Sequence, residues 1–374
     1  MSVGVVILVT TLFLSPFACA AAGVSEGNAV GSDKSGGSLA HQKLEVHLFG
    51  GDMRPGAPLA RWYRDIGITD VWLYPVHGAF PQDQAPETQR SLPQLAEDGI
   101  LGAYGANAIR YWWFERPVPD YFYYMDSQGA DPGKDVIWGT TERAEARWAE
   151  VCGNIQRIYG SVRDAGFAGI VYDNEAYYSY AGPAKRWLWE GHEGQLGPTG
   201  NYYRRGKQVG SAIMSVWPNP RVMMVYSFGY PGEYWWYKGF KDSGVDLYLA
   251  VEHTYGAGPA KSGDQWYQHW WRPGKLTGIV EWKRSVFRFL KDNRHVVPGL
   301  FPIDFGTGLP NYEFRYFKEQ LQQASALAGD GPFSVWLWPQ GDFSPERWND
   351  IRFPPGISAN DYVNLLKSYS LQNE

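Results

Sequence analysis

The stretch of residues 167–178 decides the fold, and it reads FAGIVYDNEAYY. Residues 169–172 form a short apolar run with a β-branched centre, which predicts a buried strand. The run ends abruptly in Asp173, Asn174 and Glu175. Carboxylates are almost never fully buried unless they are paired. A strand that ends in two of them therefore indicates either a functional edge of a sheet or a polar turn that caps the next helix.

Strands and helices alternate on both sides of this stretch. Apolar residues at three- and four-residue spacings predict a helix over residues 141–164, directly before it. Three similar tripeptides each end a helix just before a strand: Asp65-Ile66-Gly67, Asp164-Ala165-Gly166 and Asp242-Ser243-Gly244. The predicted strands cover residues 44–49, 70–74, 108–114, 169–172, 221–228, 245–252, 295–303 and 333–338. The other predicted helices lie at residues 59–66, 209–217, 234–241, 279–290, 314–328 and 358–369.

This alternation predicts parallel strands joined by crossover helices. Eight units in one domain predict an α/β fold, a (β/α)₈ TIM barrel, with long βα loops at residues 78–107, 115–140 and 253–278. A doubly wound open sheet is the alternative. No Gly-x-Gly-x-x-Gly follows the first strand and no P-loop is present, so the sequence predicts no nucleotide cofactor.

The N-terminal segment has the pattern of an exported protein. Residues 3–14 are apolar, too short to span a bilayer, and are followed by Ala18-Cys19-Ala20-Ala21-Ala22. We therefore expect residues 1–22 to be a signal peptide, residues 23–42 a flexible leader and residues 43–374 the catalytic barrel. Removal of the signal would leave Cys152 as the single cysteine and no transmembrane segment. The expected location is secreted or periplasmic.

Composition narrows the class of ligand. The net charge is −5 with both signs spread along the chain, which does not resemble a basic nucleic-acid surface. The 7 histidines form no zinc motif, so no metal site is predicted. Aromatic residues make up 16% of the chain, including 18 Trp and 25 Tyr, and their flat faces suit stacking on sugar rings.

In a barrel, functional side chains gather at the carboxyl ends of the strands. Acids, histidines and aromatic residues recur at the predicted strand ends: His77 after the second, Trp112 on the third, Asp173, Asn174, Glu175 and Tyr177 after the fourth, Glu252, His253 and Tyr255 after the sixth, Asp304 after the seventh and Trp338 after the eighth. Random loop polarity would supply more Lys, Ser and Asn. The functional interpretation of residues 173–175 is thus favoured over the capping turn.

These motifs resemble the retaining (β/α)₈ glycoside hydrolases of clan A. In that family an Asn-Glu pair ends the fourth strand and its Glu is the acid/base, which matches Asn174-Glu175. A His-x-Tyr at the sixth strand matches His253-Thr254-Tyr255, and a Trp after the eighth strand matches Trp338. The family's nucleophile is often the Glu of Glu-Phe-Gly, whereas this chain has Asp304-Phe305-Gly306.

Two further resemblances keep the roles of the carboxylates open. Asp173-Asn174-Glu175 also resembles the Asp-x-Glu of chitinase-like barrels, where the Glu is the acid and the substrate's N-acetyl group is the nucleophile. Tyr172-Asp173-Asn174 is similar to the motif of α-galactosidase-like barrels, which would make Asp173 the nucleophile.

The motifs and these resemblances together predict a secreted glycoside hydrolase that acts on a poly- or oligosaccharide. The predicted catalytic residues are Glu175, Asp304, Asp173 and Glu252. The predicted substrate-binding residues are Asn174, His253, Tyr255, Trp338, Trp112, His77 and Tyr177. Two alternatives remain open: a barrel that binds carbohydrate without catalysis, and a substrate-assisted, chitinase-like hydrolase.

Overall fold

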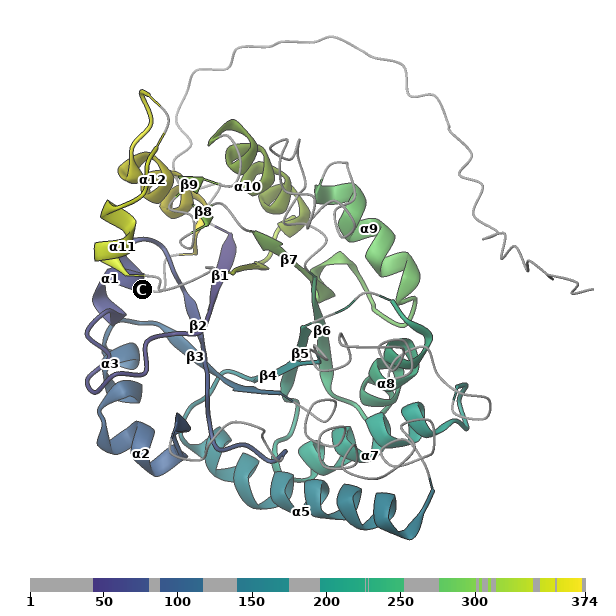
Figure 1. Ribbon diagram of the computed structural model, residues 1–374. Helices are drawn as coiled ribbons and strands as arrows, with labels where there is room; N and C mark the ends of the chain where they lie inside the picture. Colours follow the sequence, from purple (N-terminus) through teal and green to yellow (C-terminus); the bar gives the residue numbers. More distant parts are fainter. Residues whose placement is uncertain are drawn as a thin grey trace, which may run out of the picture. The chain divides into compact units, whose positions relative to one another are not determined.

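The computed structural model describes residues 43–80, 88–116, 140–174, 196–225, 227, 229–251, 276–300, 303–304, 309–310, 314–338, 344–353 and 355–371. Eight parallel strands close into a barrel in the order β1-β10-β7-β6-β5-β4-β3-β2, and helices surround it (Figure 1). The barrel strands are β1 (Leu44–Phe49), β2 (Asp70–Leu73), β3 (Arg110–Glu115), β4 (Ile170–Asp173), β5 (Arg221–Val225), β6 (Asp246–Val251), β7 (Val296–Leu300) and β10 (Phe333–Leu337). The predicted (β/α)₈ barrel is confirmed, and the open sheet is excluded.

The remaining elements lie between and after these strands. They are α1 (Ala60–Asp65), α2 (Leu92–Glu97), α3 (Ile100–Ala106), α5 (Glu142–Asp164), α7 (Asn201–Val216), α8 (Pro231–Asp242), α9 (Leu276–Val286), the 3₁₀ helix η5 (Asn293–His295), α10 (Phe314–Ala328), α11 (Pro345–Asn349) and α12 (Ala359–Tyr369). A short antiparallel pair, β8 (Ile303–Asp304) with β9 (Leu309–Pro310), stands apart from the barrel sheet. Within the described residues, no helix combines the length and apolar character required to cross a membrane.

The three Asp-x-Gly tripeptides end helices as predicted. Helices α1, α5 and α8 have Asp65, Asp164 and Asp242 as their last residues. The glycine two residues later has a positive φ in each case, 93° at Gly67, 85° at Gly166 and 104° at Gly244. Glycine adopts this conformation without the steric cost that a Cβ imposes, so the repeat reverses the chain into the next strand.

Helices α2 and α3 lie inside the segment of residues 78–107 that the sequence analysis treats as a loop. Helix α2 begins with a capping box, in which the Ser91 hydroxyl accepts from the backbone N–H of Gln94 and the Gln94 side chain accepts from the backbone N–H of Ser91. Pro93 occupies the first turn, where its missing N–H is harmless. The prolines and glycines that indicate a loop are here compatible with two short helices.

Side chains fill the barrel interior because alternate residues of each strand point inward. The interior cluster consists of Trp72, Trp112, Phe114, Val171, Met223, Val225, Ala250, Val297 and Trp336. The glycine of the opening stretch makes room for one of these rings. A Cβ on Gly169 would lie 2.4 Å from the Trp112 ring and 2.6 Å from the Arg221 carbonyl oxygen.

Charged side chains close the amino-terminal end of the barrel. Glu45 pairs with Arg110 at 2.8 Å and with Arg221 at 3.1 Å, and the Ser334 hydroxyl donates to it at 2.7 Å. The two guanidinium groups and the hydroxyl outweigh burial and hold the pKa of Glu45 at about 2. Arg110 also donates to Asp70 at 2.7 Å. This network joins strands β1, β2, β3, β5 and β10 at the end opposite to the expected active site.

Candidate active site

Asp173 is the last residue of β4, and its side chain points into the barrel. It is paired in register with Val225, which belongs to the interior cluster, and neighbouring residues of parallel strands share a face. The residue is 3% exposed. Its carboxylate lies 3.3 Å from the guanidinium of Arg116, which directly follows β3. The opening stretch therefore delivers a paired carboxylate to the carboxyl ends of the strands, as predicted from its sequence.

One aromatic ring, Tyr74, packs against the Arg116–Asp173 pair. The Arg116 guanidinium lies 5.4 Å from the centroid of the Tyr74 ring, in cation–π geometry. Tyr74 in turn packs edge-on against Phe114 at 4.9 Å and stacks with Phe49 at 6.4 Å. The ion pair therefore contacts Tyr74, which in turn belongs to a cluster of three aromatic side chains.

Trp338 follows β10 at the same end of the barrel. Its backbone N–H donates to the Leu300 carbonyl oxygen at 3.3 Å, which ties it to the end of β7. The indole is partly buried and packs against the interior cluster. A ring in this position keeps part of its surface available to a ligand.

Asn174 points in the opposite direction to Asp173. It is 1% exposed, and its amide donates to the Val225 carbonyl oxygen and the Tyr237 hydroxyl, both at 3.3 Å. Tyr237 belongs to α8, so the Asn174 amide lies between the sheet and that helix. Its described contacts join β4, β5 and α8; a contact with substrate stays a prediction.

Trp112 lies deeper in the barrel than the sequence analysis expects. It is fully buried, its indole N–H donates to Asp70 at 2.7 Å, and the Arg221 guanidinium lies 5.0 Å from its ring. Trp113 is also fully buried and packs on the helix side of β3. Neither ring of this pair has an exposed face. The sequence does not predict this, because strand alternation indicates the side to which a residue points but not its depth in the barrel.

His77 lies in the connection after β2. Its side chain is partly buried, and its backbone N–H donates to the Arg90 carbonyl oxygen at 2.9 Å. Five other expected site residues lie outside the described residues: Glu175, Tyr177, Glu252, His253 and Tyr255. The backbone of Asp304 is in β8. The roles assigned to all these residues stay predictions.

Glu115 is a buried carboxylate that the sequence analysis does not select. It ends β3, is 1% exposed, and is paired in register with Tyr172, whose side chain packs in the outer core. Glu115 therefore points away from the barrel interior. Burial raises its pKa above the usual value, although the hydrogen bonds that it accepts act in the opposite direction. The sequence feature that could have identified Glu115 is the pair Glu115-Arg116, because strand alternation places these two opposite charges on opposite faces of the sheet.

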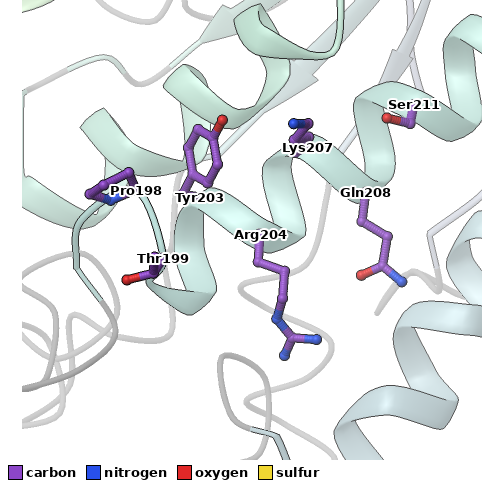
Figure 2. A pocket seen from close by; sticks show the side chains of 7 residues that line it. All are labelled: Pro198, Thr199, Tyr203, Arg204, Lys207, Gln208 and Ser211. Carbon is purple, nitrogen blue, oxygen red and sulfur yellow. The ribbon is translucent and has the colours of Figure 1, made fainter.

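A hollow of about 480 Å³ lies on the surface of α7 and is shown in Figure 2. Its lining residues are Pro198, Thr199, Tyr203, Arg204, Lys207, Gln208 and Ser211. Arg204 pairs with Glu145 at 2.8 Å, and the Tyr203 hydroxyl donates to Asp242 at 2.9 Å. These groups link α7 to α5 and α8, on the outside of the barrel and away from Asp173. Over the described part of the chain, no group of three or more His, Cys, Asp or Glu side chains is placed to hold a metal ion.

The chain is only distantly similar to solved structures. No family model and no curated protein matches the chain. The catalytic domain of the major endoglucanase from Xanthomonas campestris pv. campestris is similar at 12% identity and a TM-score of 0.47, over 88% of this chain and 94% of that one. A chitinase from Pseudoalteromonas aurantia is similar at 10% identity and a TM-score of 0.42, over 79% and 93%. Morphinone reductase is similar at 12% identity and a TM-score of 0.43, over 79% and 81%. The closed eight-stranded parallel sheet itself makes the chain a (β/α)₈ barrel.

Proposed function

We propose that the chain is a glycoside hydrolase that cleaves glycosidic bonds in a poly- or oligosaccharide. The observation that carries the proposal is the Arg116–Asp173 pair, seated on Tyr74 at the carboxyl ends of the strands. Sugar hydrolysis requires a pair of carboxyl groups, and Asp173 supplies one carboxylate at the functional end of the barrel.

The position of Asp173 suits the role of an ionised carboxylate. A guanidinium at 3.3 Å favours the charged form of its partner, so Asp173 is better suited to stabilise positive charge on the sugar, or to attack it, than to donate a proton. We assign the proton to Glu175, two residues further along the chain. The second carboxylate is Asp304 by first choice, with Asp173 and Glu252 as the other candidates. A retaining mechanism needs about 5 Å between the two carboxyl groups, and an inverting one about 6.5–9.5 Å.

A reducing-sugar assay on cellulose, mannan, chitin and pectin oligosaccharides tests the activity. Release of sugar by the wild type supports a hydrolase, and release from none of them contradicts the proposal and favours a non-catalytic binding barrel. Glu175→Gln removes the proton source and should lower turnover about 10²–10⁴-fold, whereas Glu142→Gln, an exposed substitution at the start of α5, should not. A nitrophenyl glycoside needs less protonation of its leaving group and should lose less activity in Glu175→Gln.

The assignment of Asp304 has a separate test. Asp304→Asn should lower turnover severely on both the oligosaccharide and the nitrophenyl glycoside, because no leaving group replaces a missing nucleophile or base. Normal turnover in Asp304→Asn would transfer the role to Asp173 or Glu252, whose asparagine and glutamine variants are measured alongside.

We also propose that the protein is exported and that residues 1–22 are removed. The support is the apolar run of residues 3–14 and the small residues up to Ala22. The mass of the protein recovered from the medium or periplasm should match a chain that begins at residue 23. An uncleaved chain that stays in the cytoplasm would contradict this.

A further inference from the structure

Glu115 lies on the helix side of the sheet, on the face opposite to the Arg116–Asp173 pair. Its carboxylate accepts hydrogen bonds from four donor groups. These are the backbone N–H groups of Ala79 and Phe80, the indole N–H of Trp113 and the hydroxyl of Tyr159. An ionised carboxylate has acceptor sites for all of them and brings no donor of its own.

On one side this carboxylate fixes the connection that follows β2. The Ala79 N–H lies 3.0 and 2.9 Å from its two oxygens, and the Phe80 N–H lies 3.2 Å from one of them. The approach is so close that a Cβ on Gly78 would lie 2.1 Å from the Glu115 carboxyl carbon. The same connection begins with Tyr74, the ring beneath the Arg116 guanidinium.

On the other side Glu115 is linked to β4. The Tyr159 hydroxyl, from α5, donates to Glu115 at 2.7 Å and lies 2.8 Å from the Tyr172 hydroxyl. Tyr172 directly precedes Asp173, and its ring also meets the Phe80 ring edge-on at 5.4 Å. One buried carboxylate therefore reaches the segments that carry Tyr74 and Asp173, while its neighbour in the chain, Arg116, contacts both of those side chains from the opposite face.

We infer that Glu115 is a positioning residue for the proposed hydrolase, and the inference rests on that proposed function. It holds the carboxyl ends of β2, β3 and β4 in the arrangement that seats Arg116 between Tyr74 and Asp173. It contacts no substrate. Its effect on catalysis passes through the backbone of residues 78–80 and through the Tyr159–Tyr172 hydroxyl pair.

The test is Glu115→Gln in the full chain, with Glu45→Gln as the matched control. Both substitutions replace a buried, hydrogen-bonded carboxylate by an amide, but Glu45 lies at the opposite end of the barrel. The amide NH₂ introduced by Glu115→Gln must face at least one of the four donors. Hydrogen exchange of the Ala79 and Phe80 amides, relative to core amides of the same variant, should therefore be about tenfold faster in Glu115→Gln and unchanged in Glu45→Gln.

Turnover is measured at a temperature where circular dichroism shows all variants folded, on the oligosaccharide that the wild type cleaves fastest. Misplacing reacting groups by about 1 Å costs up to about 10²-fold, so we expect kcat to fall about 10- to 100-fold in Glu115→Gln. Glu45→Gln should keep near-normal kcat. Glu115→Asp restores the charge, and should recover part of both the amide protection and the turnover.

The outcomes separate the two proposals. If the wild type cleaves no saccharide, the proposed function fails and so does the catalytic part of this inference, while faster exchange at residues 79–80 still supports the anchoring contacts. If the wild type is active but Glu115→Gln keeps the kcat of Glu45→Gln, the positioning role is overturned and the proposed function stands. Unchanged exchange at residues 79–80 in Glu115→Gln overturns the anchoring role in either case.

Discussion

Replacing His47 with glutamine should make the barrel less sensitive to acid. His47 lies in β1, is fully buried and points into the interior between Trp72 and Trp112. The indole N–H of Trp72 donates to its Nδ1 at 3.2 Å. A protonated imidazole would direct an N–H at that indole N–H, so the folded state favours the neutral ring.

The charged groups around His47 oppose one another. Burial, the largest influence, disfavours its protonated form; Asp70 and Glu45 favour that form, and Arg110 and Arg221 disfavour it. The result is a pKa lowered from 6.5 to about 4. In the unfolded chain the imidazole binds its proton near pH 6.5, so acid favours unfolding between pH 6.5 and 4.

The size of the effect follows from this difference in pKa. Each pKa unit corresponds to about 1.36 kcal/mol, so the complete loss of stability is about 3 kcal/mol. Linkage between the two pKa values gives a loss of about 1 kcal/mol at pH 5.5 and about 2–3 kcal/mol at pH 4.5. Almost no loss is expected above about pH 7.5, where the imidazole is largely neutral in both states.

Urea unfolding at pH 7.5, 5.5 and 4.5, at one ionic strength, measures how the free energy of unfolding changes with pH. Glutamine offers an oxygen to the Trp72 N–H and does not titrate, so His47→Gln carries a constant cost of substitution at every pH. The difference in unfolding free energy between wild type and His47→Gln should therefore shift by about 1 and then about 2–3 kcal/mol in favour of the variant as the pH falls. A difference that stays constant from pH 7.5 to 4.5 would refute the reasoning.

Three further predictions concern the two ends of the barrel. Gly78→Ala places a Cβ 2.1–2.5 Å from the Glu115 carboxyl atoms, so it should lower the free energy of unfolding by about 1–3 kcal/mol, measured by urea denaturation. An unchanged free energy would mean that residues 78–80 can move away from Glu115. Trp338→Ala should weaken oligosaccharide binding, measured by calorimetry, more than it lowers the melting temperature; a loss of about 3–5 kcal/mol of stability with unchanged binding would instead identify a core residue. Glu45, with its pKa lowered from 4.5 to about 2, contributes about 3 kcal/mol above pH 4.5, and this contribution disappears as the pH falls to 2. Glu45→Gln should therefore be less stable than wild type at pH 7 and approach it near pH 2, and a gap that does not narrow would contradict the ion-pair account.

The sequence predicts the barrel well because its strands are buried on both faces. Continuous apolar runs such as residues 170–172, bounded by glycine and by acids, identify strands without any knowledge of tertiary contacts. Each Asp-x-Gly repeat then marks the return from a helix. Helices α2 and α3 are missed because Pro93, Gly99, Gly102 and Gly105 indicate a loop, while the capping box at Ser91 is the feature that identifies the helix start.

The site is less predictable, because alternation along a strand fixes direction but not depth. Arg110, Trp112 and Glu115 all belong to β3, and each lies at a different place. Arg110 pairs with Glu45 at the amino-terminal end, Trp112 lies in the middle of the interior, and Glu115 lies on the helix side. The stagger between tilted strands sets these levels, and it depends on pairing with distant segments. The position of Asp173 could be predicted because it is the last residue of its strand: the strand end sets its depth in the barrel, and alternation sets the side to which it points.

The adjacent charges Glu115 and Arg116 also bear on how the sheet finds its correct alignment. A slip of β3 by one residue would exchange the faces of every side chain on the strand. Arg116 would then turn toward the N–H groups of Ala79 and Phe80, where donors would face donors, and Glu115 would enter the interior. Trp112 would leave a space fitted to it by Gly169. A strand shifted by one residue is therefore disfavoured on both faces at once, so this pair of charges stabilises the native register of β3 over its nearest alternatives.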